Sequence, residues 1–183
     1  MSKLETNQVD PSTGTTLTLG TSGDTIAIPS GVTLANSGTA TGFSANTPSF
    51  SAQLSSAQSI ADNTTVVIIF DQENHDTDNA YNTSTGEFTV PSGKGGKYFF
   101  HTHFRLNSTS DSSRLAMFIQ VNGSTKATYN NVQRDEDSSG VSLVIDLNAG
   151  DEVRAGIFQN TGAAKNSKTA DNVMFMGFKL IGA

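Results

Sequence analysis

Cysteine and tryptophan are both absent from this 183-residue chain. Without cysteine, neither disulfide bonds nor cysteine-ligated metals can hold the fold together, so stability has to come from buried apolar surface. Lysine and arginine are also scarce, 11 against 17 aspartates and glutamates, which gives a formal charge of −6. Because binding to nucleic acid requires clustered basic side chains, this balance argues against a nucleic-acid partner.

Long apolar segments are missing as well. The longest strictly apolar run, Val66 to Phe70, is far too short to span a bilayer, and the first residues, Met1 to Gln8, contain no apolar stretch of the kind found in secretory signals. We therefore expect no membrane insertion and no export by a signal peptide.

Short catalytic motifs are also lacking. The sequence contains no G-x-S-x-G, no H-E-x-x-H and no dinucleotide-binding fingerprint, and its three histidines leave few options for acid–base chemistry. We expect a protein that is not an enzyme.

The chain is instead rich in Ser, Thr, Asn and Gly, with apolar residues in short alternating runs, which predicts an all-β fold. Between the apolar runs, Asn122-Gly123 is a strong hairpin signal and residues 148–151 form a second turn. Ten strands are expected in the larger part of the chain, over residues 49–54, 58–61, 64–70, 87–91, 97–107, 113–122, 124–133, 140–147, 152–160 and 172–181.

Residues 1–47 differ from residues 48–183 in their residue pattern, and the stretch of small residues at 35–42 suits a linker between the two regions. Three short strands are expected in the first region, at 16–20, 25–29 and 31–34. Their alternating aliphatic side chains are too few to form a core in one chain, although three chains together could form one. These side chains are Leu17, Leu19, Ile26, Ile28, Val32 and Leu34.

Residues 22–34, SGDTIAIPSGVTL, followed by residues 38–43, GTATGF, resemble an element found in tail-fibre and other structural proteins of marine bacteriophages. The resemblance covers about thirty residues of simple types and implies an attachment or trimerisation segment. The alternative is a flexible leader rich in Ser, Thr and Gly.

Several runs of residues 48–183 resemble, in the same order, the globular domain of the C1q and tumour necrosis factor superfamily. The spacing between Phe88 and Gly96 is two residues longer than usual, and Thr102 stands where an aromatic residue is common. A collagen-like Gly-X-Y stalk is missing. The matching runs are Phe50-Ser51-Ala52, Phe70 before a polar loop, residues 82–91 (NTSTGEFTVP), residues 96–100 (GKYFF), His103, residues 147–153 (LNAGDEV) and residues 175–180 (FMGFKL).

This resemblance implies a ten-stranded jelly-roll sandwich that assembles as a homotrimer, with one sheet of each protomer packed around a three-fold axis. Alternation along residues 97–107 sends Phe99, His101, His103 and Arg105 to one face. Their mixture of aromatic and polar groups is closer to a subunit interface than to a solvent-exposed surface. We take these four residues, together with Leu17, Leu19, Ile26 and Ile28 of the first region, as candidates for the trimer interface.

Two groups of residues are candidates for metal binding. His101 and His103 could bring six imidazoles near one axis in a trimer, either as a metal site or as a pH-dependent contact. The alternative is histidines of the interface or the core that are satisfied by hydrogen bonds. The loop at 71–79 is rich in oxygen ligands and could bind calcium through Asp76 and Asp78, although a solvated acidic loop is the simpler interpretation. No other cofactor is expected.

The leading hypothesis is a bacteriophage virion protein, a tail fibre or capsid-attached fibre. Residues 1–47 would join other virion proteins, and residues 48–183 would form a trimeric knob that binds a host surface glycan or protein. Release by lysis would explain a virion protein without an export signal, and the lack of disulfides suits assembly in a reducing cytoplasm. The alternatives are a decoration protein that stabilises the capsid without binding a receptor, and a secreted C1q-like binding module.

Overall fold

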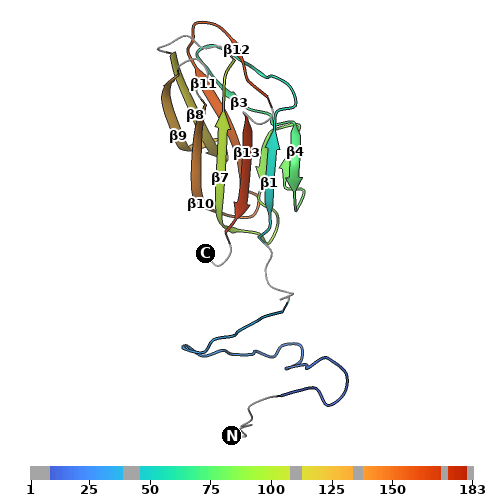
Figure 1. The fold of residues 1–183 in the computed structure, drawn as a ribbon. Coiled ribbons are helices and arrows are strands. Elements are labelled where there is room, and N and C mark those ends of the chain that lie inside the picture. The colour runs from blue at the N-terminus through green and yellow to red at the C-terminus, as the bar shows by residue number, and fades with distance from the viewer. Residues whose placement is uncertain (1–8, 39–45, 108–112, 134–137, 170–172, 181–183) are drawn as a thin grey trace. The chain divides into compact units, whose positions relative to one another are not determined.

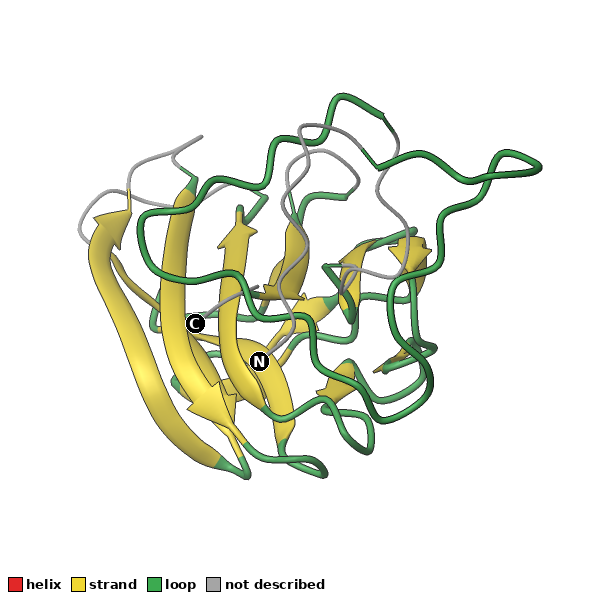
Figure 2. Cartoon of the chain, turned by 90° about the horizontal axis from the view of Figure 1, so that it is seen from below, coloured by secondary structure: helices red, strands yellow, loops and turns green. Residues whose placement is uncertain are grey.

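The structure is a computed structural model that describes residues 9–38, 46–107, 113–133, 138–169 and 173–180. It separates the chain into two compact units, Met1–Phe43 and Ser44–Ala183, and each unit is considered by itself. The described residues form strands, turns and loops but no helix, which confirms the all-β prediction (Figure 2). None of these ranges therefore contains a helix long and apolar enough to cross a membrane.

The larger unit is built from antiparallel strands, thirteen of them in the residues described. Each of the ten predicted strands has a counterpart, whereas β4, β5 and β12 lie in segments expected to be loops. The strands are β1 (Ser49–Gln53), β2 (Ser59–Ile60), β3 (Thr64–Val67), β4 (Gln72–Asp76), β5 (Tyr81–Asn82), β6 (Glu87–Thr89), β7 (Gly96–Phe104), β8 (Ser113–Val121), β9 (Ser124–Gln133), β10 (Ser139–Leu147), β11 (Glu152–Gln159), β12 (Lys165–Asn166) and β13 (Met174–Lys179).

Two main sheets face each other across the core. One has five strands in the order β10-β7-β13-β1-β4, and Figure 1 shows these strands side by side. The other has the order β5-β6-β11-β8-β9, with β3 also paired to β11. Strands far apart in sequence are therefore neighbours, as in the pairing of β1 with β13 and of β7 with β13.

A cluster of aromatic rings fills the space between the sheets. Phe50 stacks on Tyr81 at 4.8 Å between ring centroids and on Phe88 at 5.0 Å, and it meets the edge of Phe175 at 5.0 Å. All four side chains are buried. Because the chain has no cysteine, no disulfide contributes to its stability, and the burial of these large rings stabilises the fold.

The prediction of a loop over residues 71–79 was wrong in part, because residues 72–76 form β4 at the edge of the five-stranded sheet. Its sequence, QENHD, is polar throughout and lacks the alternation on which strand prediction depends. Polar and charged side chains are common on edge strands, where they discourage pairing with other chains.

The three strands predicted in the first region are not present, since residues 9–38 contain only turns and extended segments. The six aliphatic side chains of the three predicted strands are exposed by 43–70%. The turns themselves are defined, since the amide of Asp24 donates to the carbonyl of Thr21 at 3.0 Å and the carboxylate of Asp24 accepts from the amide of Thr21 at 2.7 Å. A segment this short has no second layer within one chain against which strands could pack.

Candidate functional site

The outward surface of the five-stranded sheet, which we call the open face, carries large apolar side chains that the core does not cover. Along β7, residues 98, 100, 102 and 104 are buried in the core, and Phe99, His101 and His103 between them are half-exposed. The side chains that alternate with these face the core, and each is exposed by no more than 1%: Tyr98, Phe100, Thr102, Phe104 and Leu106. Thr102, where an aromatic residue was expected, donates its hydroxyl to the carbonyl oxygen of Met174 at 2.9 Å.

The register of the strands arranges the open face in rows. Phe99 lies opposite Val144 of β10 on one side and Phe178 of β13 on the other, and the Phe99 and Phe178 rings are 5.3 Å apart. His101 lies between Ser142 and Met176 in the next row, and His103 lies between Gly140 and Met174 in the row beyond. Val144 is 57% exposed. An aromatic pair, two methionines and an exposed valine on one sheet surface are typical of the centre of a protein interface.

The sequence pattern predicts only the β7 part of this surface. Four further residues of the surface were not predicted, and the folded sheet places them beside the predicted ones: Met174, Met176, Phe178 and Val144. The alternation within the predicted strands 140–147 and 172–181 already places these residues on one face, but nothing in the sequence alone shows that these strands flank β7. Arg105 follows the end of β7, and its carbonyl oxygen accepts a hydrogen bond from the amide of Lys168 at 2.8 Å.

Asp76 and Asp78, the candidate calcium ligands, lie at the end of the edge strand: Asp76 is the last residue of β4, and Asp78 follows two residues later. The carboxylate of Asp76 accepts from the amide of Tyr81 at 2.7 Å and from the amide of Asp78 at 3.2 Å. The carboxylate of Asp78 is 3.6 Å from the Lys94 ammonium and accepts from the Thr77 hydroxyl at 2.9 Å. In the described part of the chain, no three His, Cys, Asp or Glu side chains gather where they could hold a metal ion. Both carboxylates thus have a structural role in the loop, and the calcium site stays a prediction.

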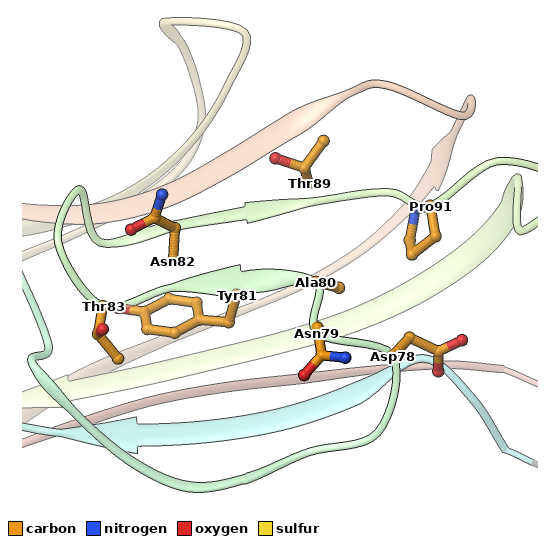
Figure 3. A pocket seen from close by; sticks show the side chains of 8 residues that line it. All are labelled: Asp78, Asn79, Ala80, Tyr81, Asn82, Thr83, Thr89 and Pro91. Atoms are coloured by element: carbon orange, nitrogen blue, oxygen red, sulfur yellow. The ribbon is translucent and has the colours of Figure 1, made fainter.

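An open pocket of about 510 Å³ lies next to this loop (Figure 3). Asp78, Asn79 and Pro91 line one end, Asn82 and Thr83 line the other, and the lining also includes Ala80, Tyr81 and Thr89. The ring of Tyr81 is only 5% exposed and its hydroxyl donates to the carbonyl of Phe70 at 3.2 Å, so this ring cannot stack on a ligand. What the pocket offers is amide, hydroxyl and carboxylate groups suited to a polar ligand.

Two antiparallel sheets packed face to face, with strands from both ends of the domain paired at the centre of one sheet, define a jelly-roll β-sandwich. The features of this scaffold that could serve as a site are the open face and the pocket.

The comparisons with known proteins agree with this class. Residues 49–180 match the C1q domain family, so the chain belongs to that family. No curated protein sequence matches the chain.

Three solved structures are similar in fold. PRD1 vertex protein P5 has a TM-score of 0.59 at 16% identity, with 75% of this chain and 99% of that chain covered. Murine APRIL at pH 8.0 has a TM-score of 0.56 at 15% identity, with coverages of 73% and 98%. The globular domain of zebrafish complement 1qA protein has a TM-score of 0.53 at 18% identity, with coverages of 73% and 97%.

Proposed function

We propose that this chain is a trimeric structural protein of a bacteriophage particle. Residues 48–183 form an outer knob that attaches to the host surface, and residues 1–47 join the knob to neighbouring virion proteins. The single observation that carries this proposal is the open face, whose aromatic pair, methionines and exposed Val144 need a partner to cover them. The occupant that best fits it is a second and third copy of the same chain, because the C1q and tumour necrosis factor proteins that the domain resembles pack this way around a three-fold axis.

The first region supports assembly from several copies. Its alternating aliphatic side chains are exposed by 43–70% in one chain, and a surface of this kind is normally covered in a soluble assembly. Three copies wound together would bury Leu17, Leu19, Ile26 and Ile28 against one another. The resemblance of this segment to phage tail-fibre elements, and the fold shared with a vertex protein of PRD1, favour a virion over a secreted module.

The pocket beside residues 78–91 is the candidate for host attachment. Its amides, hydroxyls and carboxylate match the hydroxyl groups of a glycan, although it offers no exposed aromatic ring. Binding sites are commonly found on such loops at the edge of a rigid scaffold.

The proposal is tested in two steps. Light scattering of the purified full chain at micromolar concentration should give the mass of three chains, and a stable single-chain species would contradict it. Antibodies raised against the chain should then label particles of the phage that encodes it.

The same reagents separate a fibre from a capsid decoration protein. For a fibre with an attachment role, the label lies at the tail or on a projecting fibre, and the soluble chain competes with particles for adsorption to host cells. Uniform labelling of the shell without competition would replace the attachment role with a decoration role.

A further inference from the structure

His101 and His103 form a contacting pair on the open face. They are two residues apart on β7, which places both side chains on the same side of the sheet. Their ring centroids are 5.9 Å apart, and both side chains are half-buried. The third histidine, His75, lies on β4 opposite Ser51, and β13 and β1 separate its strand from β7.

The neighbouring strand leaves room for these two rings. Gly140 of β10 lies opposite His103, and a Cβ atom at this glycine would lie 3.2 Å from Cε1 of His101 and 3.4 Å from Cβ of His103. Any side chain at this position would therefore crowd the imidazoles. Across β13 the residues opposite the pair are Met174 and Met176, so uncharged residues flank the histidines on both neighbouring strands.

The ring of His101 is held in a fixed orientation. Its Nδ1 lies 2.9 Å from the hydroxyl oxygen of Ser142, which leaves Nε2 as the nitrogen for a ligand. Histidines that bind metals are commonly oriented by such a hydrogen bond at the other ring nitrogen.

Two imidazoles from one chain do not complete a metal site, because zinc takes at least three protein ligands. Three chains around one axis would supply six imidazoles. We propose that the His101–His103 pairs of three chains bind one first-row transition metal ion of the zinc class on the three-fold axis. This inference rests on the proposed trimer through the open face. Calcium is not the expected ion, since it prefers oxygen ligands, whereas imidazole suits zinc, nickel, copper and cobalt.

The test uses the full chain without a polyhistidine tag. The protein is stripped with a chelator, incubated with Zn²⁺ and dialysed. The bound metal is then measured by mass spectrometry, and the molecular mass by light scattering, on the same sample. We expect one zinc ion for every three chains, a thermal midpoint that rises with zinc concentration, and visible absorption bands when Co²⁺ replaces Zn²⁺.

Single substitutions test whether the zinc ion is bound by His101 and His103. His101→Gln and His103→Gln should each lower zinc occupancy at least tenfold while the mass stays that of a trimer. Ser142→Ala should weaken zinc affinity about tenfold through the lost orientation of His101. His75→Gln is the matched control on the same sheet and should keep full occupancy.

The outcomes separate this inference from the proposed function. A trimer that retains no zinc or cobalt after dialysis overturns the metal site and leaves the trimer standing. Full occupancy in both β7 variants, or loss in His75→Gln, also overturns it. A single-chain mass for the wild type overturns the trimer and the metal site together. Because the wild-type measurement is itself decisive, the test does not depend on the folding of any variant.

Discussion

Gly177 allows β13 to pack against the aromatic core. It pairs with Phe100 of β7, and a Cβ atom built at this glycine would lie 2.4 Å from Cδ1 of Phe100 and 3.0 Å from Cε1 of Phe50. Both rings are exposed by no more than 1%, so neither can move aside without displacing others. The run of residues 175–180 that matches the C1q pattern thus contains a glycine for a steric reason.

Replacing Gly177 by alanine should therefore destabilise the domain. We expect a loss of about 1–3 kcal/mol, the usual cost of overpacking a dense core, measured by urea unfolding at a fixed protein concentration. Gly95→Ala is the milder comparison and should cost less, since its Cβ would make a tight contact of 3.3 Å with the Leu147 carbonyl oxygen but would not overlap a buried ring. Equal midpoints for Gly177→Ala and wild type would show that the core is looser than these distances indicate.

His101 gives the domain a pH dependence whose sign follows from its environment. Burial and the adjacent His103 lower its pKa below the ordinary value of 6.5, while Ser142 and Met176 opposite it carry no charge. The unfolded chain therefore takes up a proton at a higher pH than the folded chain does. Folding stability should fall as the pH drops below about 6.5, and the loss is complete once the pH is below the folded pKa.

Urea unfolding at pH 7.5 and pH 5.5 checks this expectation. The stability lost between the two pH values should be smaller in His101→Gln than in wild type. The lowered pKa of Asp151, which arises from hydrogen bonds with Asn122 and Asn148, acts at more acidic pH, near and below 3.8, and does not interfere. An identical loss in both proteins would assign the effect to other groups.

The turn between β8 and β9 is hydrogen-bonded to the turn between β10 and β11. Asn122 and Gly123 have φ angles of 50° and 75°, as a two-residue turn of this type requires. The Asn122 side chain donates to Oδ1 of Asp151 at 2.8 Å and accepts from the amide of Glu152 at 2.9 Å. Asn122 therefore adopts the backbone conformation that its own turn requires, and its side chain stabilises the turn that joins β10 to β11.

Asn122→Ala should cost about 1–2 kcal/mol, because it removes two hydrogen bonds and places alanine at a positive φ. Asn122→Gly separates the two causes, since glycine tolerates the backbone conformation but lacks the side-chain bonds. We expect an intermediate loss for Asn122→Gly in thermal unfolding monitored by circular dichroism. Equal stability of all three proteins would mean that the bonds to Asp151 and Glu152 contribute nothing.

Strands and turns can be predicted from the sequence where neighbouring residues determine them. Alternation located the long strands, and Asn122-Gly123 located the hairpin. Prediction from the sequence fails where pairing with a distant strand determines the structure. The polar strand β4 is an example, since it forms by pairing with β1. Prediction fails also in residues 9–38, where the alternation is clear but one chain offers no partner layer.

For the whole molecule, the order of the matched runs was enough to predict the jelly roll, and membership of the C1q family over residues 49–180 agrees with it. The candidate site was only partly predictable. The pattern along β7 identified Phe99, His101 and His103, but the surface that they share with Phe178 and Val144 depends on which strands are neighbours. That information lies in the topology and not in any short run of sequence.

The open face should decide whether the chain assembles into a trimer. Phe178→Glu puts a charge beside Phe99, whose ring lies 5.3 Å away, at the centre of the surface that the trimer would bury. A buried, unpaired carboxylate costs several kcal/mol, and a trimer buries three of them. We expect the variant to elute as single chains at micromolar concentration in chromatography with light scattering, whereas the wild type elutes as a trimer.

Tyr129→Glu is the matched control for this variant. Tyr129 is a 44% exposed aromatic residue on β9, in the other sheet, so the same charge is added outside the open face. Its trimer should persist, and both variants should keep the circular dichroism spectrum of a β-sandwich. If Phe178→Glu remains trimeric, the interface lies elsewhere on the domain. If Tyr129→Glu dissociates as readily, added charge in general weakens assembly and the open face has no special part in it.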